Sequence, residues 1–342
     1  MFLRATHLTF GSHGGRGFLA ALLLALGLAF ALVTVPTTWT AQAQARTENA
    51  YPLTLVDDEG TEVVIEALPE RIISLSPANT EIVFGLGAGD RLVGGTDFDD
   101  YPAEAADLTD VATFSGVVME RVVELDPDLV LAAGNFFTPP DDIARMRELG
   151  YAVVVVYAPD VPAVLADIEL IGEAIGRSSE AIAITTRMAS QLEAISEAAT
   201  AGGERPRTFY QLGSEPEIFG PAPDSFVADM VTLAGGEPIT TSDPVVFSIP
   251  LEELIVADPE VIVVGDANYG VCPGDVAGRS GWTGMTAVVN GDIRAVDDVP
   301  VTRPGPRLAQ GLASLALAID PGLELDLDAL GLALDEPLCT DA

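Results

Sequence analysis

Two stretches of the chain share one pattern of hydrophobic and polar positions. Residues 119–137, MERVVELDPDLVLAAGNFF, and residues 251–269, LEELIVADPEVIVVGDANY, each begin with one or two helical turns. An Asp-Pro pair follows in both copies, and proline cannot continue a helix and moves its predecessor out of the right-handed helical region. The run of Val, Leu and Ile that comes next lacks alternation, as in a strand buried on both faces of a parallel sheet. The pattern predicts one helix–turn–strand unit in two places.

The two stretches lie at a constant offset. The three positions at which they are identical are all 132 residues apart: Glu120 and Glu252, Asp126 and Asp258, and Pro127 and Pro259. A repeat at this distance favours two similar α/β lobes over a solenoid of short units.

Apolar runs alternate with helical segments around the copies, which favours a mainly parallel α/β layer in each lobe. Residues 51–66 predict a pair of edge strands. Residues 161–203 predict two helical pieces, and the second, from about Ser178 to Ala199, spans roughly 30 Å at 1.5 Å per residue. We therefore predict an α/β fold with two Rossmann-like lobes, residues 46–160 and 204–342, joined by a single long helix within this connector. The second lobe ends in an acidic tail.

The first 45 residues follow a different pattern. Arg4 and Arg16 precede an apolar run over residues 18–33, and the segment ends in Ala-Gln-Ala-Gln-Ala. This is the order of a secretory signal peptide. The alternative is an uncleaved membrane anchor, but the run of about sixteen residues is shorter than the roughly 20 that a spanning helix needs. We predict a signal peptide over residues 1–45 and a periplasmic or extracellular protein, without a lipid anchor because no Cys lies near the cleavage site.

Removal of the leader removes both histidines, His7 and His13, and the chain contains no lysine. The mature part therefore lacks Ser-His and Cys-His catalysis, Schiff bases and His-ligated zinc. An enzyme would depend on carboxylate pairs, as secreted glycoside hydrolases do. Asp97, Asp99 and Asp100 form the obvious acidic cluster, for which a solvated loop is the favoured interpretation. We expect no enzyme, no metal site and no cofactor, and keep a carboxylate-based hydrolase as an alternative.

Charge and cysteine content narrow the possible partners. Because the leader holds two of the sixteen arginines, the mature chain has 14 basic and 52 acidic residues and a formal charge of −38. Such a surface repels nucleic acid and anionic membranes. Cys272 and Cys339 form an even pair in an exported chain, which favours a disulfide over two free thiols. Closing that loop would contribute about 4 kcal/mol and tie the tail to the second lobe.

Several stretches together resemble the exported binding proteins of ABC importers for cobalamin and ferric siderophores, most of all the cobalamin-binding members. The resemblance covers residues 68–321 and is carried by RIISLSPANTEIVFGLG, GTDFDDYP, DVATFSGVVMERVVELDPDLVLA and VPVTRPGPRLAQGLASLA. It implies a monomeric receptor with a ligand cleft between its lobes, which passes cobalamin or a ferric siderophore to an ABC permease dimer with its ATPase. A ferric-siderophore or haem receptor of the same fold is the alternative.

The resemblance also implies residue roles. Glu120 and Glu252 match the two glutamates that dock onto arginines of the permease, although an acid in a helix's first turn also complements the macrodipole by about 0.3–1 kcal/mol. The cleft positions are Phe98, Phe114, Phe247 and Arg303. The competing interpretation places the phenylalanines in the core and pairs Arg303 with Asp297 or Asp298.

Two departures from the family pattern leave the ligand open. The tryptophan expected on the first lobe's cleft wall is replaced by the residues around Ala133, with Phe136 and Phe137 close behind. The loop over residues 269–282 is also longer than in the cobalamin binders, and its Tyr269, Arg279 and Trp282 either face the cleft or cover the lobe.

Overall fold

The computed structural model describes residues 50–113, 115–134, 137–334 and 338–339. The predicted signal peptide, Phe114 and Phe136 lie outside these residues. No helix in the described ranges is both long enough and apolar enough to cross a membrane.

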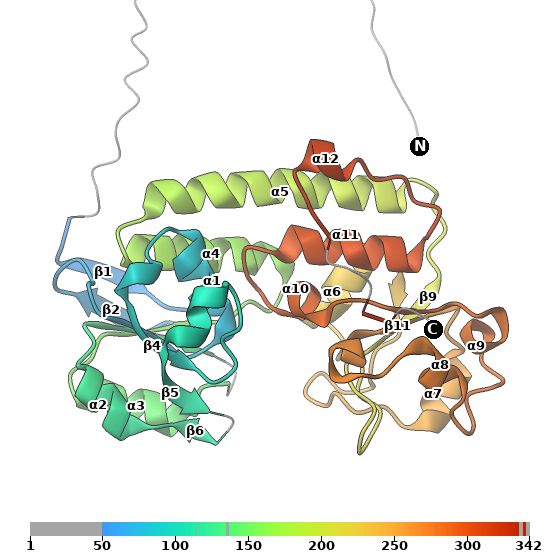
Figure 1. The fold of residues 1–342 in the computed structure, drawn as a ribbon, viewed down its shortest axis with the longest axis horizontal. Helices are drawn as coiled ribbons and strands as arrows, with labels where there is room; N and C mark the ends of the chain where they lie inside the picture. The colour runs from blue at the N-terminus through green and yellow to red at the C-terminus, as the bar shows by residue number, and fades with distance from the viewer. Residues whose placement is uncertain (1–49, 114, 135–136, 335–337, 340–342) are drawn as a thin grey trace, which may run out of the picture. The chain divides into compact units, whose positions relative to one another are not determined.

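The first lobe is built on a six-stranded sheet whose strands are parallel except for β6 (Figure 1). In spatial order its strands are β6 (Gly116–Val117), β5 (Thr109–Thr113), β4 (Leu92–Thr96), β3 (Ile72–Ser74), β7 (Leu129–Ala133) and β8 (Val153–Val156). All four residues of β8 and the first four of β7 are buried, as the unalternating apolar runs predict. Its helices are α1 (Pro77–Gly85), α2 (Met119–Leu125) and α3 (Pro140–Glu148), with short 3-10 turns η1 (Gly89–Arg91) and η2 (Ala103–Asp107).

The predicted edge strands form a separate two-stranded sheet. β1 (Leu53–Val56) pairs with β2 (Glu62–Ile65) in antiparallel register. The turn between them binds the free edge of β8, because the backbone nitrogen of Asp58 donates to the carbonyl of Val155 at 3.1 Å. The hairpin therefore covers the edge of the main sheet without extending it.

The second lobe carries a smaller, fully parallel sheet of four strands. Their spatial order is β10 (Glu237–Pro238), β9 (Arg207–Gln211), β11 (Val261–Val264) and β12 (Ile293–Ala295). The surrounding helical elements are α6 (Phe226–Leu233), α7 (Leu251–Ala257), η3 (Gly265–Tyr269), α8 (Pro273–Ala277), α9 (Thr286–Asn290), α10 (Asp298–Thr302), α11 (Leu308–Ile319) and α12 (Leu327–Leu330). A disulfide joins Cys272, at the start of α8, to Cys339 in the tail.

Two successive helices lie between the lobes along the chain, and the second of them runs over both lobes (Figure 1). α4 (Val161–Ala174) is capped by Asp160, whose carboxylate accepts from the backbone nitrogen of Ala163 at 2.9 Å. Gly176, with φ +71, turns the chain into α5 (Ser178–Thr200). Figure 1 shows α5 running beside α4 and α11 over both lobes, which matches the single long helix predicted from the sequence.

The connector lies inside one continuous hydrophobic core. That core contains Leu131 of β7, Ile171 of α4, Met188 of α5 and Val263 of β11, all of which are buried. One face of each sheet thus packs against the connector. The other face packs against a second hydrophobic core that lies within the same lobe. Because apolar contacts run from lobe to lobe through α4 and α5, the connection is stiff in the way a packed interior is.

Candidate ligand and docking sites

Exposed aromatic side chains collect where the parallel strands end. Phe98 follows β4 and is 52% exposed, and Phe137 follows β7 and is 77% exposed. On the second lobe Tyr269 follows β11 and is 84% exposed, and Phe247 is 43% exposed. Phe247 belongs to the same end of that lobe. Its chain neighbour Ser248 forms a β-bridge with Phe219, and Phe219 forms another with Gly213, just beyond the end of β9. Ligands of open α/β sheets bind outside the carboxyl ends of the strands, so these aromatics stand where a ligand is expected.

Arg303 does not pair with Asp297 or Asp298; its partners lie on the first lobe. Its Nη1 donates at 2.7 Å both to Oε1 of Glu81, in α1, and to Oδ1 of Asp100. Asp297 accepts instead from Asn268 and Asp298 from Tyr210, so the competing interpretation of the sequence named the wrong acids. Burial opposes the charge on Arg303, but the hydrogen bonds to Asp100 and Glu81 prevail and raise its pKa.

Arg307 strengthens the same link between the lobes. It donates to both carboxylate oxygens of Glu81, from Nε at 2.9 Å and from Nη2 at 2.7 Å. Its guanidinium also lies 4.0 Å from the ring centre of Tyr101, a cation–π contact. Glu81 is 4% exposed, so this buried carboxylate is compensated by arginines from the other lobe.

The acidic cluster after β4 is not a fully solvated loop. Asp97 and Asp100 are exposed, but Asp99 is only 6% exposed. It accepts from the hydroxyls of Thr80 and Thr96, both at 2.8 Å, and from the backbone nitrogen of Thr96 at 3.0 Å. Burial raises the pKa of Asp99 in spite of these bonds. Asp99 therefore fixes the loop that carries Phe98 and Asp100.

The loop over residues 269–282 divides between the surface and the lobe interior. Trp282 is 2% exposed and belongs to the second lobe's core, and Arg279 stacks on it at 4.9 Å. Arg279 donates to Gln211 at 2.7 Å and to Ser214 at 2.8 Å. Both of those residues in turn donate to the buried carboxylate of Asp266. Arg279 and Trp282 thus organise the ends of β9 and β11, and Tyr269 alone of the three is largely exposed.

The two repeat glutamates occupy equivalent positions. Glu120 is the second residue of α2 and Glu252 the second residue of α7. Both are exposed, and neither forms an ion pair with a described residue. In Figure 1 both helices lie at the end of their lobe away from α5. Each copy of the repeated unit thereby presents one carboxylate that is not in an ion pair.

The turns behind these glutamates are also matched. The helices end at Asp126 and Asp258, which adopt left-handed φ values of 45° and 46°. Arg71 donates from Nε to the carbonyls of Leu125 and Asp126 at 3.0 and 3.2 Å. Arg207 makes the equivalent bonds in the second lobe at 3.2 and 3.0 Å. These arginines satisfy carbonyls that a helix end leaves unpaired, and they went unnoticed in the sequence.

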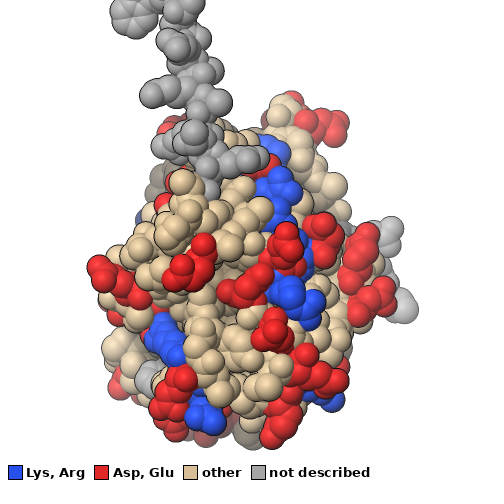
Figure 2. Space-filling view, turned by 90° about the vertical axis from the view of Figure 1, so that its left-hand side faces the viewer, with Lys and Arg blue, Asp and Glu red and all other residues tan. Residues whose placement is uncertain are grey.

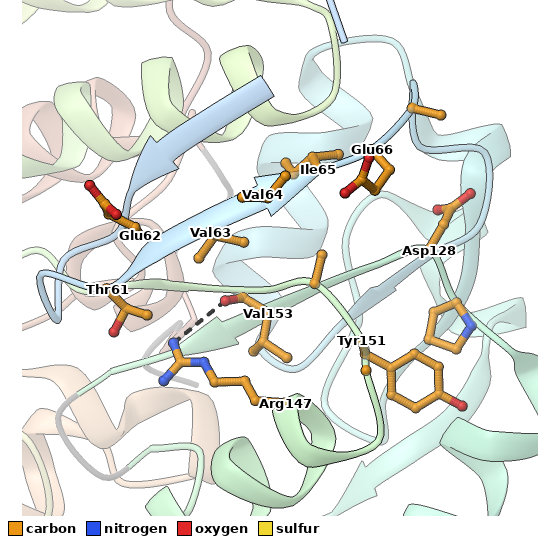
Figure 3. A pocket seen from close by; sticks show the side chains of 14 residues that line it. Thr61, Glu62, Val63, Val64, Ile65, Glu66, Asp128, Arg147, Tyr151 and Val153 are labelled. Atoms are coloured by element: carbon orange, nitrogen blue, oxygen red, sulfur yellow. Dashed lines mark hydrogen bonds between the residues drawn. The ribbon is translucent and has the colours of Figure 1, made fainter. Parts of the chain in front are cut away.

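A pocket of about 530 Å³ lies in the first lobe between β2 and the start of β8 (Figure 3), and none of the exposed aromatics named above lines it. Glu62, Glu66 and Asp128 line it together with Arg147, which donates to the carbonyl of Val153. Among the described residues no group of three or more His, Cys, Asp or Glu side chains is placed to hold a metal ion.

A family description of periplasmic binding proteins matches residues 72–300, more than half of the chain. The chain belongs to the periplasmic binding protein family. Its relatives are substrate-binding proteins of ABC transporters and not enzymes, so the hydrolase alternative is wrong.

Two relatives cover most of this periplasmic binding protein. An uncharacterized ABC transporter substrate-binding lipoprotein, YvrC of Bacillus subtilis, is 33% identical over 309 residues, which are 89% of this chain and 97% of YvrC. A cobalamin-binding protein of Halobacterium salinarum is 30% identical over 286 residues, 81% of this chain and 76% of the relative.

Solved structures confirm the two-lobe fold. The vitamin B12 binding protein BtuF of Vibrio cholerae has a TM-score of 0.66 at 25% identity and covers 74% of this chain and 98% of BtuF. The haem-binding protein HmuT has a TM-score of 0.68 at 22% identity and covers 80% of this chain and 93% of HmuT, a likeness of fold alone. The relatives thus place the chain among the substrate-binding proteins of ABC transporters.

Proposed function

We propose that this protein is an exported receptor that captures a corrinoid such as cobalamin and delivers it to an ABC importer. The relatives of Halobacterium and Vibrio named for cobalamin or vitamin B12 support this choice of ligand. Family membership supports a permease dimer with its ATPase as the partner, and export by the predicted signal peptide.

Capture is assigned to the aromatics at the strand ends. Phe98 and Phe247 present large apolar rings from opposite lobes. Phe114, which lies outside the described residues, stays a third candidate from the sequence. Aromatic rings bury a wide flat area with little loss of conformational entropy, which suits a planar macrocycle. In this proposal Arg303 serves the ligand site indirectly, by holding Asp100 and Glu81 beside the loop of Phe98.

Delivery is assigned to Glu120 and Glu252, and their equivalence is the observation that carries the proposal. A permease dimer has two-fold symmetry, so a receptor that uses both lobes must present the same charge twice. Exposed carboxylates at the same position of a repeated unit meet that requirement. Charge complementarity of this kind steers encounter and fixes the register of docking.

The packed connector implies that the lobes move little when ligand binds. A core that runs from β7 through α4 and α5 to β11 opposes the large hinge closures of sugar and amino-acid receptors. Solution scattering of the empty and loaded receptor should therefore give nearly superimposable curves, and a large domain rotation would contradict this part of the proposal.

The ligand is tested by calorimetric titration of residues 46–342 with cyanocobalamin. We expect saturable one-to-one binding with a submicromolar dissociation constant. Phe98→Ala and Phe247→Ala should each weaken binding about tenfold, since each removes roughly 1.4 kcal/mol of buried contact. Val64→Ala, an exposed apolar position on β2, is the matched control and should leave binding unchanged. Absence of heat would reject cobalamin and leave the receptor fold in place.

A further inference from the structure

We propose that this receptor selects against anionic chelates, because its cationic side chains are committed to partners within the protein. The inference rests on the proposed ligand site at the strand ends, and it names the charge class that the site accepts. Neutral or cationic chelates rich in amides fit, whereas carboxylate-bearing or catecholate chelates do not.

The protein has few cationic side chains, and most of them already bind partners within the protein. The chain has no lysine, both histidines lie in the leader, and Arg4, Arg16 and Arg46 fall outside the described residues. Of the thirteen arginines that remain, twelve donate to a carboxylate, a carbonyl or a polar side chain of the protein. The thirteenth, Arg187, is exposed on α5 and far along the chain from every strand end.

The two arginines that link the lobes form a neutral cluster with their acidic partners. Arg303 and Arg307 carry two positive charges, and Glu81 and Asp100 carry two negative ones, with contacts of 2.7 to 2.9 Å. The side chains of both arginines are only 16% exposed. To bind an anionic ligand fully, Arg303 would have to leave Glu81, whose side chain is 3% exposed. Glu81 would then keep Arg307 alone, and weakening the compensation of a buried carboxylate costs more than a new exposed ion pair returns.

The free charges around the aromatics are negative. Asp97, next to Phe98, and Asp243, on the loop that leads to Phe247, are exposed, and neither forms an ion pair with a described residue. Figure 2 shows acidic side chains spread over the first lobe's end of the molecule, with the arginines set among them. At a formal charge of −36 for the whole chain, this field disfavours the approach of any anion. The neutral amide groups of a corrinoid are not repelled in such a site, because their N–H groups can donate hydrogen bonds to the free carboxylates.

The test uses two ligands that differ by one charge. Calorimetry compares cyanocobalamin with its monocarboxylate, in which one side-chain amide has been hydrolysed, at low and at high salt. We expect the monocarboxylate to bind at least about tenfold more weakly at low salt, with a smaller gap at high salt because salt screens the repulsion. Equal or tighter binding of the monocarboxylate at low salt would overturn the proposal.

A charge variant tests the cluster itself. Asp100→Asn leaves Arg303 partly uncompensated and should narrow the gap between the two ligands several-fold. Asp107→Asn, at another exposed carboxylate of the same lobe, makes the same change in net charge and should leave most of the gap in place. An equal effect of the two variants would assign the selection to net charge alone and reject the role of the cluster.

Failure of the cobalamin assignment is separable from failure of the charge rule. If cyanocobalamin does not bind, the same titration is made with neutral ferrichrome, cationic ferrioxamine B, anionic ferric enterobactin and anionic hemin. Preference for a neutral or cationic chelate upholds the charge rule without cobalamin. Preference for an anionic chelate overturns it, and binding of no chelate overturns both proposals.

Discussion

The α2–β7 unit of the first lobe and the α7–β11 unit of the second have the same geometry, although only three of their nineteen positions are identical. In each, a seven-residue helix ends at an aspartate with left-handed φ. An arginine binds the last carbonyls, Arg71 from just before the neighbouring strand β3 and Arg207 from the first residue of the neighbouring strand β9. What the two units share is therefore a backbone course and an exposed glutamate, with different side chains filling the core behind them.

The units differ in how the turn is held. Asp258 accepts from both the backbone nitrogen and the hydroxyl of Thr286, each at 2.8 Å, and these bonds lower its pKa. No described residue donates to the side chain of Asp126, and Arg71 binds only carbonyls there. The second lobe has the smaller sheet and the disulfide, so it relies more on side-chain and covalent ties.

Charge reversal of the glutamates should have the largest effect. Glu120→Arg or Glu252→Arg should each lower ligand delivery in a reconstituted importer at least about tenfold, since like charges at an interface cost several kcal/mol. The double variant should abolish delivery, and all three should bind ligand in solution as the wild type does.

The matched controls are Glu124→Arg, on the same helix as Glu120, and Glu237→Arg, at an exposed position of the second lobe. Both change the net charge equally and should deliver ligand normally. If the controls lose as much delivery as the variants, general electrostatics and not the repeat positions govern docking.

Removal of the disulfide should weaken the second lobe selectively. Cys272→Ser with Cys339→Ser should lower the free energy of unfolding by about 4 kcal/mol, because the bridge closes a loop with a separation of 67 residues. Hydrogen exchange should quicken in α8 and η3 and remain unchanged in β3 and β7. Equal quickening in both lobes would mean that the lobes unfold as one unit.

Two aspartates should give pH dependences of opposite sign. Burial, and then the nearby charge of Asp58, raises the pKa of Asp167 in α4 to about 8. The folded state thus holds this proton more tightly, so stability is greatest at low pH and falls as pH rises toward 8. Asp258 behaves oppositely, because its pKa is lowered in the folded state. Its charged form stabilises the fold at pH values above the usual aspartate pKa, and this stabilisation is lost as the pH falls.

Asp167→Asn should consequently remove about 3 to 4 kcal/mol of the stability change between pH 5 and pH 8, with the variant more stable than the wild type at pH 8. Thermal unfolding at several pH values measures it, and Asp328→Asn, exposed on α12, serves as control. A steeper slope in the variant would contradict the assignment.

The two capping arginines should have smaller, unequal effects. Arg71→Ala should lower the free energy of unfolding by about 1 kcal/mol, the usual net value of a lost hydrogen bond. Arg207→Ala should cost about 2 kcal/mol, because Arg207 also pairs with Glu260 at 3.2 Å. Arg145→Ala breaks only an exposed pair within α3 and should change little. Urea unfolding measures these changes, and a larger loss of stability in Arg71→Ala than in Arg207→Ala would contradict the assignment.

Replacing the two turn aspartates with glycine should give the smallest changes in stability, and the changes should differ between the two copies of the repeat. Glycine adopts positive φ without strain, so Asp126→Gly should leave stability unchanged or slightly higher. Asp258→Gly should be destabilising, since it also removes the acceptor for Thr286. Equal urea midpoints for the two variants would mean that the bonds to Thr286 contribute nothing.

Local patterns made much of this fold predictable. The Asp-Pro pairs fixed the ends of α2 and α7, the unalternating runs located β7, β8 and β11, and the connector helix was predicted within a residue or two. These features depend on neighbours along the chain. The disulfide followed from the presence of two cysteines alone.

The missed features depend on residues far apart in sequence. Arg303 is 222 positions from Glu81, and nothing local to Arg303 points to α1. Asp99 was assigned to a solvated loop because its burial depends on Thr80, on another element. A signal for the capping arginines did exist, since Arg71 directly precedes β3 and Arg207 begins β9, the strands with which the main sheet of each lobe starts along the chain.

The central claim is that both lobes together engage one two-fold partner. Its most direct test is the stoichiometry of the purified, ligand-loaded receptor on the importer from the same genome, measured in lipid nanodiscs by mass photometry. The account predicts one receptor per permease dimer, and loss of the complex when Glu120 and Glu252 are both reversed. Two receptors per dimer, or a complex that survives the double reversal, would contradict it.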